Sequence, residues 1–360
     1  MATQTGGRRV LVTGGAGFIG SAISRRLAAE AARWVVVDSL HPQVHVRRER
    51  PEELHPAAEL IVGDVADPAL WDRLIADLKP EVVLHLAAET GTAQSLTEAG
   101  RHAETNVLGT ARLTDALSRA GVSPSRVLLS SSRAVYGEGR WKAEDGSVFY
   151  PPMRTHEQLA RAEWDYPGAS PLPSSAETTE PRPVNVYAAT KLAQEQLLRA
   201  WGGAMDVPVT VLRFQNVYGP GQSLTNPYTG IVSLFSQWAE AGRSIPVYED
   251  GGIVRDFVFI DDVVAAVEAA LDAPTAEGVF DVGSGTATTI LELAQTIAAY
   301  YGAPEPQITG QFRDGDVRSA SCTIDTTVAA LGWRPRIELA AGVRALQEWI
   351  ARQSSRVARD

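Results

Sequence analysis

The stretch RVLVTGGAGFIG, residues 9–20, consists of a short β-branched run, a glycine-rich turn and the start of a helix. This order is typical of the first strand, loop and helix of a dinucleotide-binding fold. Gly14 allows the tight turn, Gly17 leaves room for a pyrophosphate, and Gly20 lets the helix pack closely. Unpaired N–H groups and the helix dipole favour phosphate at that helix N-terminus.

The sequence around this loop supports the same interpretation. Val10-Leu11-Val12 predicts a buried parallel strand, and a second apolar strand, residues 34–37, ends at Asp38. An acid at about this distance from the glycines accepts hydrogen bonds from the adenosine ribose and repels a 2′-phosphate, which favours NAD over NADP. The alternative for Asp38 is a solvated loop aspartate.

Composition restricts the classes of function. The chain has 360 residues, of which 44% are hydrophobic, and it contains no apolar run near the 18 residues that span a membrane. The N-terminus has no apolar signal core, so we expect a cytoplasmic protein without a membrane partner. The net charge of −10 argues against a nucleic-acid partner. Cys322 is the only cysteine, and His41 and His45 flank Pro42, so we expect no metal site.

Strands and helices alternate through the first two thirds of the chain, which predicts a doubly wound parallel α/β sheet of the Rossmann type. The further predicted strands are residues 59–63, 82–86, 127–130 and 209–214, and the predicted helices are 68–78, 104–119, 186–202 and 229–242. Asp64 follows the third strand, at the sheet edge where such folds bind ligands. It is either an adenine partner or a helix-capping residue before Pro68.

The second half of the chain departs from this alternation. Residues 138–183 are rich in Gly, Pro, Ser and charge and predict a long irregular insertion. We expect a Rossmann domain of residues 8–214 plus 253–284. Residues 215–252 plus 285–350 then form a smaller, mostly α-helical substrate lobe, and 351–360 a flexible polar tail.

Two polar motifs lie downstream. Tyr187 and Lys191 are separated by one helical turn, so the phenol and the ammonium share a face, and a nearby cation favours the phenolate. We therefore expect the pKa of Tyr187 to be lowered toward neutral, which suits a general base. A serine cluster, Ser130-Ser131-Ser132, follows the fifth strand at the cofactor edge of the sheet.

With these motifs the chain resembles the extended short-chain dehydrogenase/reductase superfamily over nearly all of residues 8–350. It is most similar to the nucleotide-sugar 4-epimerases, including those like dTDP-L-rhamnose 4-epimerase and UDP-glucose 4-epimerase. The motifs that carry this likeness are His85-Leu-Ala-Ala-Glu-Thr-Gly, Ser132-Arg-Ala-Val-Tyr-Gly and Gln215-Asn-Val-Tyr-Gly-Pro-Gly-Gln.

The resemblance implies roles for individual residues. Tyr187 matches the catalytic base, Lys191 the residue that tunes it, Ser132 the hydroxyl that binds the reacting sugar oxygen, and Asn106 the asparagine beside the active-site helix. The residues expected to bind NAD are Gly14, Gly17, Phe18, Ile19, Gly20, Asp38, Asp64, Val65, Leu86, Ala87, Ala88, Asn106, Ser130, Tyr187 and Lys191.

A nucleotide-diphosphate sugar is the implied substrate. Arg255 and Arg313 match arginines that clamp the diphosphate, a task that suits the bidentate guanidinium, although either could instead pair with Asp256 or Asp316. The residues expected to bind substrate are Ser132, Arg133, Tyr187, Asn216, Tyr248, Arg255 and Arg313. The identity of the sugar and of the base stays open.

One departure narrows the reaction. The dehydratases of the superfamily carry an Asp-Glu pair after the active-site hydroxyl, where this chain has Arg133-Ala134, so we expect no dehydration. We expect an epimerase that inverts C4 through a transient 4-keto sugar, using NAD within each turnover. The alternatives are a nucleotide-sugar 4-ketoreductase or dehydrogenase and a non-catalytic NAD-sensing protein. Helices 104–119 and 186–202 are the expected contacts of a homodimer, by resemblance to family dimers.

Overall fold

A seven-stranded parallel sheet forms the centre of the molecule, in the order β14-β9-β5-β4-β1-β2-β3. The computed structural model describes residues 7–45, 47–224, 230–273 and 276–357, with side chains to 353. The strands are β1 (Arg9–Thr13), β2 (Arg33–Asp38), β3 (Ala58–Val62), β4 (Val82–His85), β5 (Arg126–Ser132), β9 (Val209–Phe214) and β14 (Gly278–Val282). The strand order runs outward from β1 in two directions: β2 and β3 lie on one side of it, and β4, β5, β9 and β14 lie on the other. Such sheets bind ligands at this switch point, between β1 and β4.

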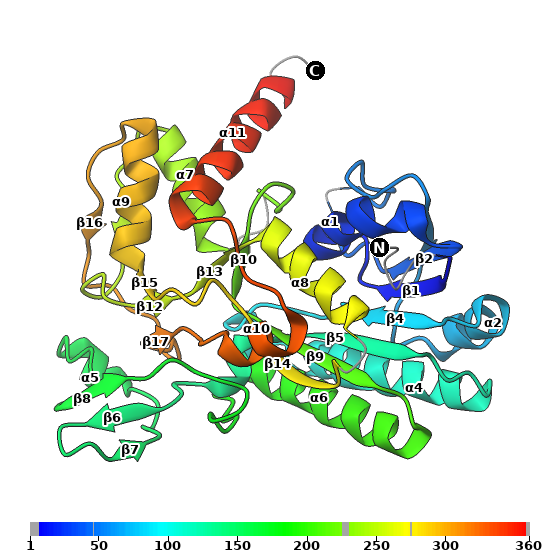
Figure 1. The fold of residues 1–360 in the computed structure, drawn as a ribbon. Coiled ribbons are helices and arrows are strands. Elements are labelled where there is room, and N and C mark those ends of the chain that lie inside the picture. The colour runs from blue at the N-terminus through cyan, green and yellow to red at the C-terminus, as the bar shows by residue number, and fades with distance from the viewer. Residues whose placement is uncertain (1–6, 46, 225–229, 274–275, 358–360) are drawn as a thin grey trace.

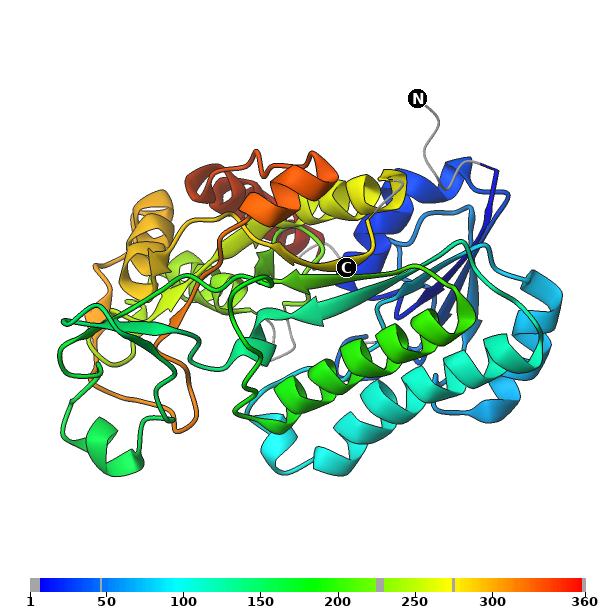
Figure 2. The same cartoon turned by 60° about the horizontal axis from the view of Figure 1, so that its bottom comes forward.

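Helices cover both faces of this sheet. One face carries α1 (Phe18–Leu27) and α8 (Ile260–Asp272), and the other carries α2 (Pro68–Leu78), α4 (Gly109–Arg119) and α6 (Val186–Met205). Figures 1 and 2 show α4 and α6 running side by side under the sheet, with α1 and α8 above it. The predicted doubly wound fold is confirmed.

The sheet divides the hydrophobic core into two clusters. Val10, Val12 and Val36 pack toward α1 and α8, whereas Leu11 and Val35 pack toward α2, α4 and α6. Because both faces are covered, these strands are continuous apolar runs rather than alternating ones. The apolar stretches after residue 9 and around residue 35 are therefore explained by the fold.

Most predicted elements lie within a few residues of the observed ones, and two differ in character. The predicted helix 104–119 begins as a π-helix, Ala103–Leu108, and continues as α4. The predicted helix 229–242 is α7, Ile231–Glu240, and residue 229 lies outside the described residues. The predicted tail from 351 is helical as far as Val357, at the end of α11 (Leu339–Val357).

The insertion at 138–183 has its own secondary structure, contrary to the prediction of an irregular segment. It contains a small antiparallel sheet of β6 (Trp141–Ala143), β7 (Val148–Phe149) and β8 (Ala169–Pro171), together with the short helix α5 (His156–Ala160). The aromatic side chain of Trp141 is fully buried there and packs edge-on against Tyr166. Sequence patterning missed these strands because they are only two or three residues long.

The smaller lobe is mostly helical, as predicted, and it also contains several strands of two or three residues. Its helices are α7, α9 (Ile290–Tyr301), α10 (Asp325–Leu331) and α11; its short strands are β10 (Asn216–Tyr218), β11 (Pro246–Val247), β12 (Val254–Arg255), β13 (Phe257–Phe259), β15 (Thr288–Thr289), β16 (Gln307–Ile308) and β17 (Ser319–Ala320). Within the described residues, no helix has the length and apolar character that crossing a membrane requires. Across the same residues, no group of three metal-ligating side chains comes together.

Candidate active site

The glycine loop lies where β1 meets β4. Gly14 has φ +66°, and a Cβ there would lie 2.6 Å from the backbone nitrogen of Ala87. The predicted turn is therefore also a packing contact with the segment after β4, which the sequence did not reveal. A Cβ on Gly20 would lie 2.5 Å from the Cα of Gly15, so the close packing at this glycine is against the loop itself.

The N-terminus of α1 is available for an anion. Gly17 is its N-cap and provides no side-chain cap for the first N–H groups of the helix. A Cβ on Gly17 would meet only the Gly14 carbonyl oxygen, at 3.5 Å, so the space in front of the helix is open. Free N–H groups at an open helix end form a binding site for phosphate.

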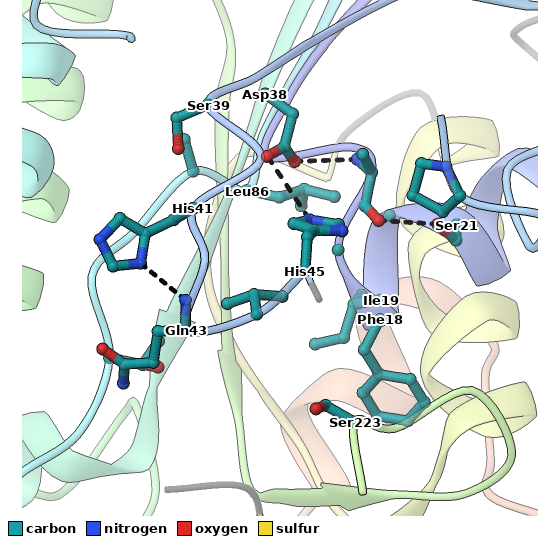
Figure 3. A pocket seen from close by; sticks show the side chains of 18 of the residues that line it. Phe18, Ile19, Ser21, Asp38, Ser39, His41, Gln43, His45, Leu86 and Ser223 are labelled. Atoms are coloured by element: carbon teal, nitrogen blue, oxygen red, sulfur yellow. Dashed lines mark hydrogen bonds and ion pairs between the residues drawn. The ribbon is translucent and has the colours of Figure 1, made fainter. Parts of the chain in front are cut away.

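Asp38 supports the same loop from the end of β2. Its Oδ2 accepts a hydrogen bond from the Ala16 N–H at 3.0 Å, and its Oδ1 accepts one from the Leu40 N–H at 2.9 Å. Figure 3 shows His45 facing this carboxylate, with Nε2 3.8 Å from Oδ1. Burial lowers the pKa of His45, although Asp38 opposes the shift. The carboxylate keeps lone pairs that a ribose hydroxyl can use.

A cleft of about 890 Å³ runs along this edge of the sheet. Its lining includes twelve of the residues expected to bind cofactor: Gly14, Gly17, Phe18, Ile19, Gly20, Asp38, Asp64, Val65, Leu86, Ala87, Ala88 and Ser130. The other three, Asn106, Tyr187 and Lys191, do not line it. The cleft also includes His41, Gln43 and His45, which the sequence analysis missed. They follow a strand at its carboxyl end, and that position was the available signal.

Asp64 is a cleft residue and not a helix cap. Its Oδ1 accepts a hydrogen bond from the Ala66 N–H at 2.8 Å, whereas the cap of α2 is Asp67, which accepts from the Ala69 N–H at 2.9 Å. The helix-cap alternative for Asp64 is therefore wrong. Its position in the cleft leaves the predicted contact with adenine open.

The predicted catalytic side chains meet where η4 (Arg133–Tyr136) packs against α6. Asn185 caps α6 by accepting from the Ala188 N–H, which fixes Tyr187 in the first turn. A side-chain hydrogen bond joins the Tyr187 phenol to Ser132, at the end of β5. Lys191, one turn further on, donates to the Ser130 carbonyl at 2.7 Å and to Gln194 Oε1 at 2.9 Å.

The pKa of Tyr187 corrects one expectation. Burial raises it above 10, while the hydrogen bond to Ser132 and the positive charge of Arg133 act in the opposite direction. The predicted lowering by Lys191 is wrong for this protein, since burial lowers the pKa of that ammonium to about 7 and Lys191 does not contribute to the Tyr187 shift. The phenol is therefore protonated in the protein alone.

Asn106 has a supporting position instead of a place in the cleft. Its amide accepts from the Glu89 N–H at 2.8 Å and donates to the Glu89 carbonyl and to Thr190 Oγ1. These bonds tie the segment after β4 to α6, one residue from Lys191. The π-helical turn that carries Asn106 is a rare conformation that is frequent at functional sites.

The residues expected to bind substrate differ in how far other protein groups already occupy their polar atoms. Arg255 is buried and donates to the Val317 carbonyl at 3.0 Å and to Asp316 Oδ1 at 2.6 Å, so the alternative of an ion pair is observed. Arg313 is exposed and stacks on the Tyr248 ring at 5.1 Å, as a pair of predicted residues brought together. Asn216 has a buried Oδ1 without a hydrogen-bond partner among the described residues.

A buried charged cluster on the substrate side was not predicted. Arg318 donates to both Glu249 and Asp250, and Arg154 donates to Glu249 Oε2 at 2.8 Å. Glu138 lies beside them, accepts from the Arg318 N–H, and burial raises its pKa to about 7. The cluster joins the insertion to the smaller lobe. No local pattern indicates it, because each arginine pairs with acids that lie far from it in the sequence.

Comparison with known proteins is consistent with this site. The model of the NAD dependent epimerase/dehydratase family matches residues 10–283. A dTDP-L-rhamnose 4-epimerase of Burkholderia thailandensis is 58% identical over 99% of this chain and 98% of its own length. A UDP-glucose 4-epimerase of Mycolicibacterium smegmatis is 34% identical over 96% of this chain and 99% of its own.

Solved structures agree with these sequence relatives. The UDP-glucose 4-epimerase of Thermotoga maritima with UDP-glucose has a TM-score of 0.78 at 29% identity, covering 96% of this chain and 99% of that one. The UDP-glucose 4-epimerase of Thermus thermophilus in complex with NAD has a TM-score of 0.75 at 29% identity, covering 95% and 99%.

Proposed function

The chain belongs to the NAD dependent epimerase/dehydratase family, and on that premise we propose that it is a nucleotide-sugar 4-epimerase acting on a dTDP-linked 6-deoxyhexose. The full-length relative at 58% identity is named as a dTDP-L-rhamnose 4-epimerase, which makes dTDP-L-rhamnose the first candidate substrate. One observation carries the chemistry: a phenol, Tyr187, is hydrogen-bonded to Ser132 at the same sheet edge as a dinucleotide loop.

NAD is the proposed cofactor of this chain, and the residues fit it. A Cβ on Gly14 or Gly20 would collide with the backbone, the N-terminus of α1 has no side-chain cap, and Asp38 is the last residue of β2. The glycine loop and α1 would hold the pyrophosphate and Asp38 the adenosine ribose. When bound, NAD⁺ supplies the acceptor for the hydride that leaves C4 and returns that hydride later in the turnover.

Tyr187 is the proposed general base and acid. As a phenolate it takes the proton of the sugar C4 hydroxyl while the C4–H bond breaks, which leaves a 4-keto sugar. It returns the same proton to the sugar oxygen when C4 becomes a secondary alcohol of opposite configuration. Ser132, hydrogen-bonded to the phenol, is placed to orient that oxygen. No acid or base stands where dehydratases need one, since Arg133 and Ala134 follow the serine.

The substrate side has groups for the nucleotide diphosphate. Arg313 and Tyr248 offer a stacked cation and ring, and the unpartnered Oδ1 of Asn216 can accept from a sugar hydroxyl. Arg255 already donates to three acceptors, the Val254 and Val317 carbonyls and Asp316, so its part in clamping the diphosphate requires its remaining N–H groups.

The test is an assay without added cofactor. Purified protein is mixed with dTDP-L-rhamnose, and C4 isomerisation is followed by NMR beside UDP- and GDP-sugars. We expect interconversion of one C4 pair with no net change in NADH absorbance. Steady NADH consumption with a 4-keto sugar would identify a ketoreductase instead, and the absence of turnover with every sugar would favour an NAD-sensing protein.

We also propose a cytoplasmic homodimer. The 103–119 helix and α6 lie next to each other, and each exposes a leucine: Leu108 with 40% and Leu197 with 37% of its surface accessible. Pairing these helices with their copies would bury those side chains. Sedimentation of the wild type and of Leu197→Glu tests the assembly, and a monomeric wild type would exclude it.

A further inference from the structure

The insertion at 138–183 takes no part in the chemistry proposed for this chain. It packs against a loop of the smaller lobe, residues 311–318, which lies between β16 and β17 (Figure 1). This loop carries Arg313, and its Asp316 accepts from Arg255 at 2.6 Å. The two arginines that are expected to clamp the substrate diphosphate therefore both depend on how this loop is held.

Side chains of the insertion hold the loop on each side of Arg313. The ring of Phe312 packs against two rings of the insertion, with its centroid 5.3 Å from that of His156 and 6.3 Å from that of Trp164. The Nδ1 atom of His156 also lies 3.0 Å from Asp314 Oδ2. The residues directly before and after Arg313 thus both contact the insertion.

Two stronger contacts hold the end of the loop. The side chain of Arg154, which is about 1% exposed, donates to the Asp316 carbonyl at 2.9 Å and to the Trp164 carbonyl at 3.1 Å. One buried guanidinium therefore joins the loop to the part of the insertion that carries Trp164. The next residue, Asp165, accepts from Arg318 Nε at 2.8 Å.

The guanidinium of Arg313 itself is left available. Arg313 is exposed and stacks on the ring of Tyr248, and it makes no hydrogen bond or ion pair within the part of the chain that the structure describes. A guanidinium has five N–H donors in a fork that matches phosphate oxygens. A free cation on a loop that is fixed at the neighbouring positions is arranged to bind an anion without first being ordered.

We propose that residues 154–166 of the insertion hold the 311–318 loop in place, so that Arg313 is already positioned for the diphosphate of the nucleotide sugar. This inference rests on the proposed function, in which Arg313 binds the diphosphate. The insertion would raise the affinity for the nucleotide without touching it, because a loop that is not held must be ordered when the ligand binds.

The contacts differ in how well they can be tested. The ion pair of His156 with Asp314 is 68% and 62% exposed, so it contributes little by itself. Arg154 also belongs to a buried ion pair with Glu249, so its removal disturbs more than the loop. Trp164 is half-buried, and Trp164→Ala removes the ring from Phe312 while keeping the carbonyl to which Arg154 donates.

The experiment measures the binding of dTDP to NAD-loaded protein by isothermal titration. It compares the wild type with Trp164→Ala and with the double variant His156→Ala/Trp164→Ala, and UDP replaces dTDP if the wild type binds UDP more tightly. We expect the dissociation constant to rise about 2–10-fold for each loop side chain that must now be ordered on binding. The dissociation constant for NAD should not change.

The matched control is Arg161→Ala in the same insertion. Arg161 pairs with Glu163 on the surface, and the two side chains are 60% and 52% exposed. This variant should bind dTDP as the wild type does. Urea denaturation of all variants shows whether they are folded under the conditions of the titration.

A double-mutant cycle with Arg313→Gln tests whether the insertion acts through Arg313. If it does, Arg313→Gln weakens dTDP binding clearly in the wild type and much less in Trp164→Ala, because residues that act together have non-additive effects. Losses that simply multiply would show that Trp164 acts on the nucleotide by another route, and they would overturn the inference.

Hydrogen exchange gives a readout that does not depend on the ligand. Amides of the 311–318 loop should exchange faster in Trp164→Ala than in the wild type or in Arg161→Ala, because fewer contacts then oppose local opening. Unchanged exchange of this loop in Trp164→Ala would count against the inference.

The outcomes for this inference and for the proposed function are separate. Wild-type affinity for dTDP in His156→Ala/Trp164→Ala would overturn the inference and leave the proposed epimerase activity untouched. Normal nucleotide binding without C4 isomerisation of any sugar would overturn the proposed function instead. A wild type that binds neither dTDP nor UDP would overturn both.

Discussion

Around the glycine loop, the cleft residues that were expected to bind cofactor lie within a few positions of the end of a parallel strand. Backbone groups hold them: Gly14 packs on Ala87 and Asp38 accepts two backbone N–H bonds. On the substrate side, ion pairs between side chains that are far apart in the sequence hold the residues in place, as between Arg154 and Glu249. The cofactor half is built from short strand-and-loop segments that neighbouring parallel strands bring together. The substrate half exists only when the insertion, the smaller lobe and η4 are assembled.

Tyr187 lies between the cofactor half and the substrate half. Removing its hydroxyl should therefore lower the rate of the reaction without weakening the binding of NAD or of the sugar. We expect Tyr187→Phe to lose about 10²–10⁴-fold in kcat, the usual contribution of a positioned acid–base group. NAD content after purification and the melting temperature should stay at wild-type values. A fall in NAD content would mean that the phenol belongs to the cofactor half.

Arg154→Met tests whether the substrate half depends on its buried charges. Arg154 and Glu249 are both about 1% exposed. Removing Arg154 leaves the buried carboxylate with Arg318 as its remaining ion-pair partner, and it also takes the hydrogen-bond donor away from the carbonyls of Trp164 and Asp316. We expect a loss of about 3–5 kcal/mol in the free energy of unfolding of the unit that holds the insertion. The KM for the sugar should rise while the affinity for NAD is unchanged.

The matched control is Arg161→Met in the same insertion. Arg161 pairs with Glu163 on the surface, with 60% and 52% of the two side chains exposed. Urea denaturation of both variants provides the comparison. Equal destabilisation by the two changes would contradict the idea that burial makes the cluster important.

Gly14→Ala is the corresponding change in the cofactor half. The new Cβ would meet the Ala87 nitrogen at 2.6 Å and would force an alanine into φ +66°. We expect a cost of about 2–4 kcal/mol, from overpacking and left-handed strain together, and a loss of bound NAD.

Gly121→Ala separates these two causes. Gly121 has φ +61° and nothing within 4 Å of the added carbon, so only the left-handed strain of about 1–2 kcal/mol applies. Isothermal titration with NAD and urea denaturation measure both variants. If Gly121→Ala were as damaging as Gly14→Ala, the contact with Ala87 would not matter.

The smallest expected effect concerns His85, which lies under the cofactor half. It hydrogen-bonds Thr13 at 2.7 Å and Thr110 at 2.8 Å, and burial lowers its pKa to about 3. The unfolded chain binds a proton below about pH 6.5 and the folded one does not. Stability from this group is therefore present above pH 6.5 and lost as pH falls toward 3.

Between pH 6.5 and 5 this loss is about 2 kcal/mol. Urea unfolding at both pH values measures it as the difference between the wild type and His85→Gln, whose amide can keep a hydrogen bond. Glu138 and Asp281, whose pKa values are raised to about 7 and about 6, act in the opposite direction but equally in both proteins. Identical pH dependence in the two proteins would mean that His85 does not remain neutral.

The sequence predicted those site residues that directly follow a strand or lie one helical turn apart. The glycines and Asp38 belong to such short motifs. Ser132 and Tyr187 were assigned separately by family resemblance, and the fold brings them together across the insertion. The role of Lys191 and the place of Asn106 were not predicted, because hydrogen bonds to Ser130, Gln194, Glu89 and Thr190 decide where these side chains point.

The sequence by itself determined the doubly wound sheet and the edge that carries the glycine loop, because strand periodicity and backbone requirements at glycine are local. Only the tertiary structure decided which charged side chains pair with each other. It bonded Arg255 to Asp316 and joined Arg154 and Arg318 to Glu249. Charges act through space and burial, and sequence separation says nothing about either.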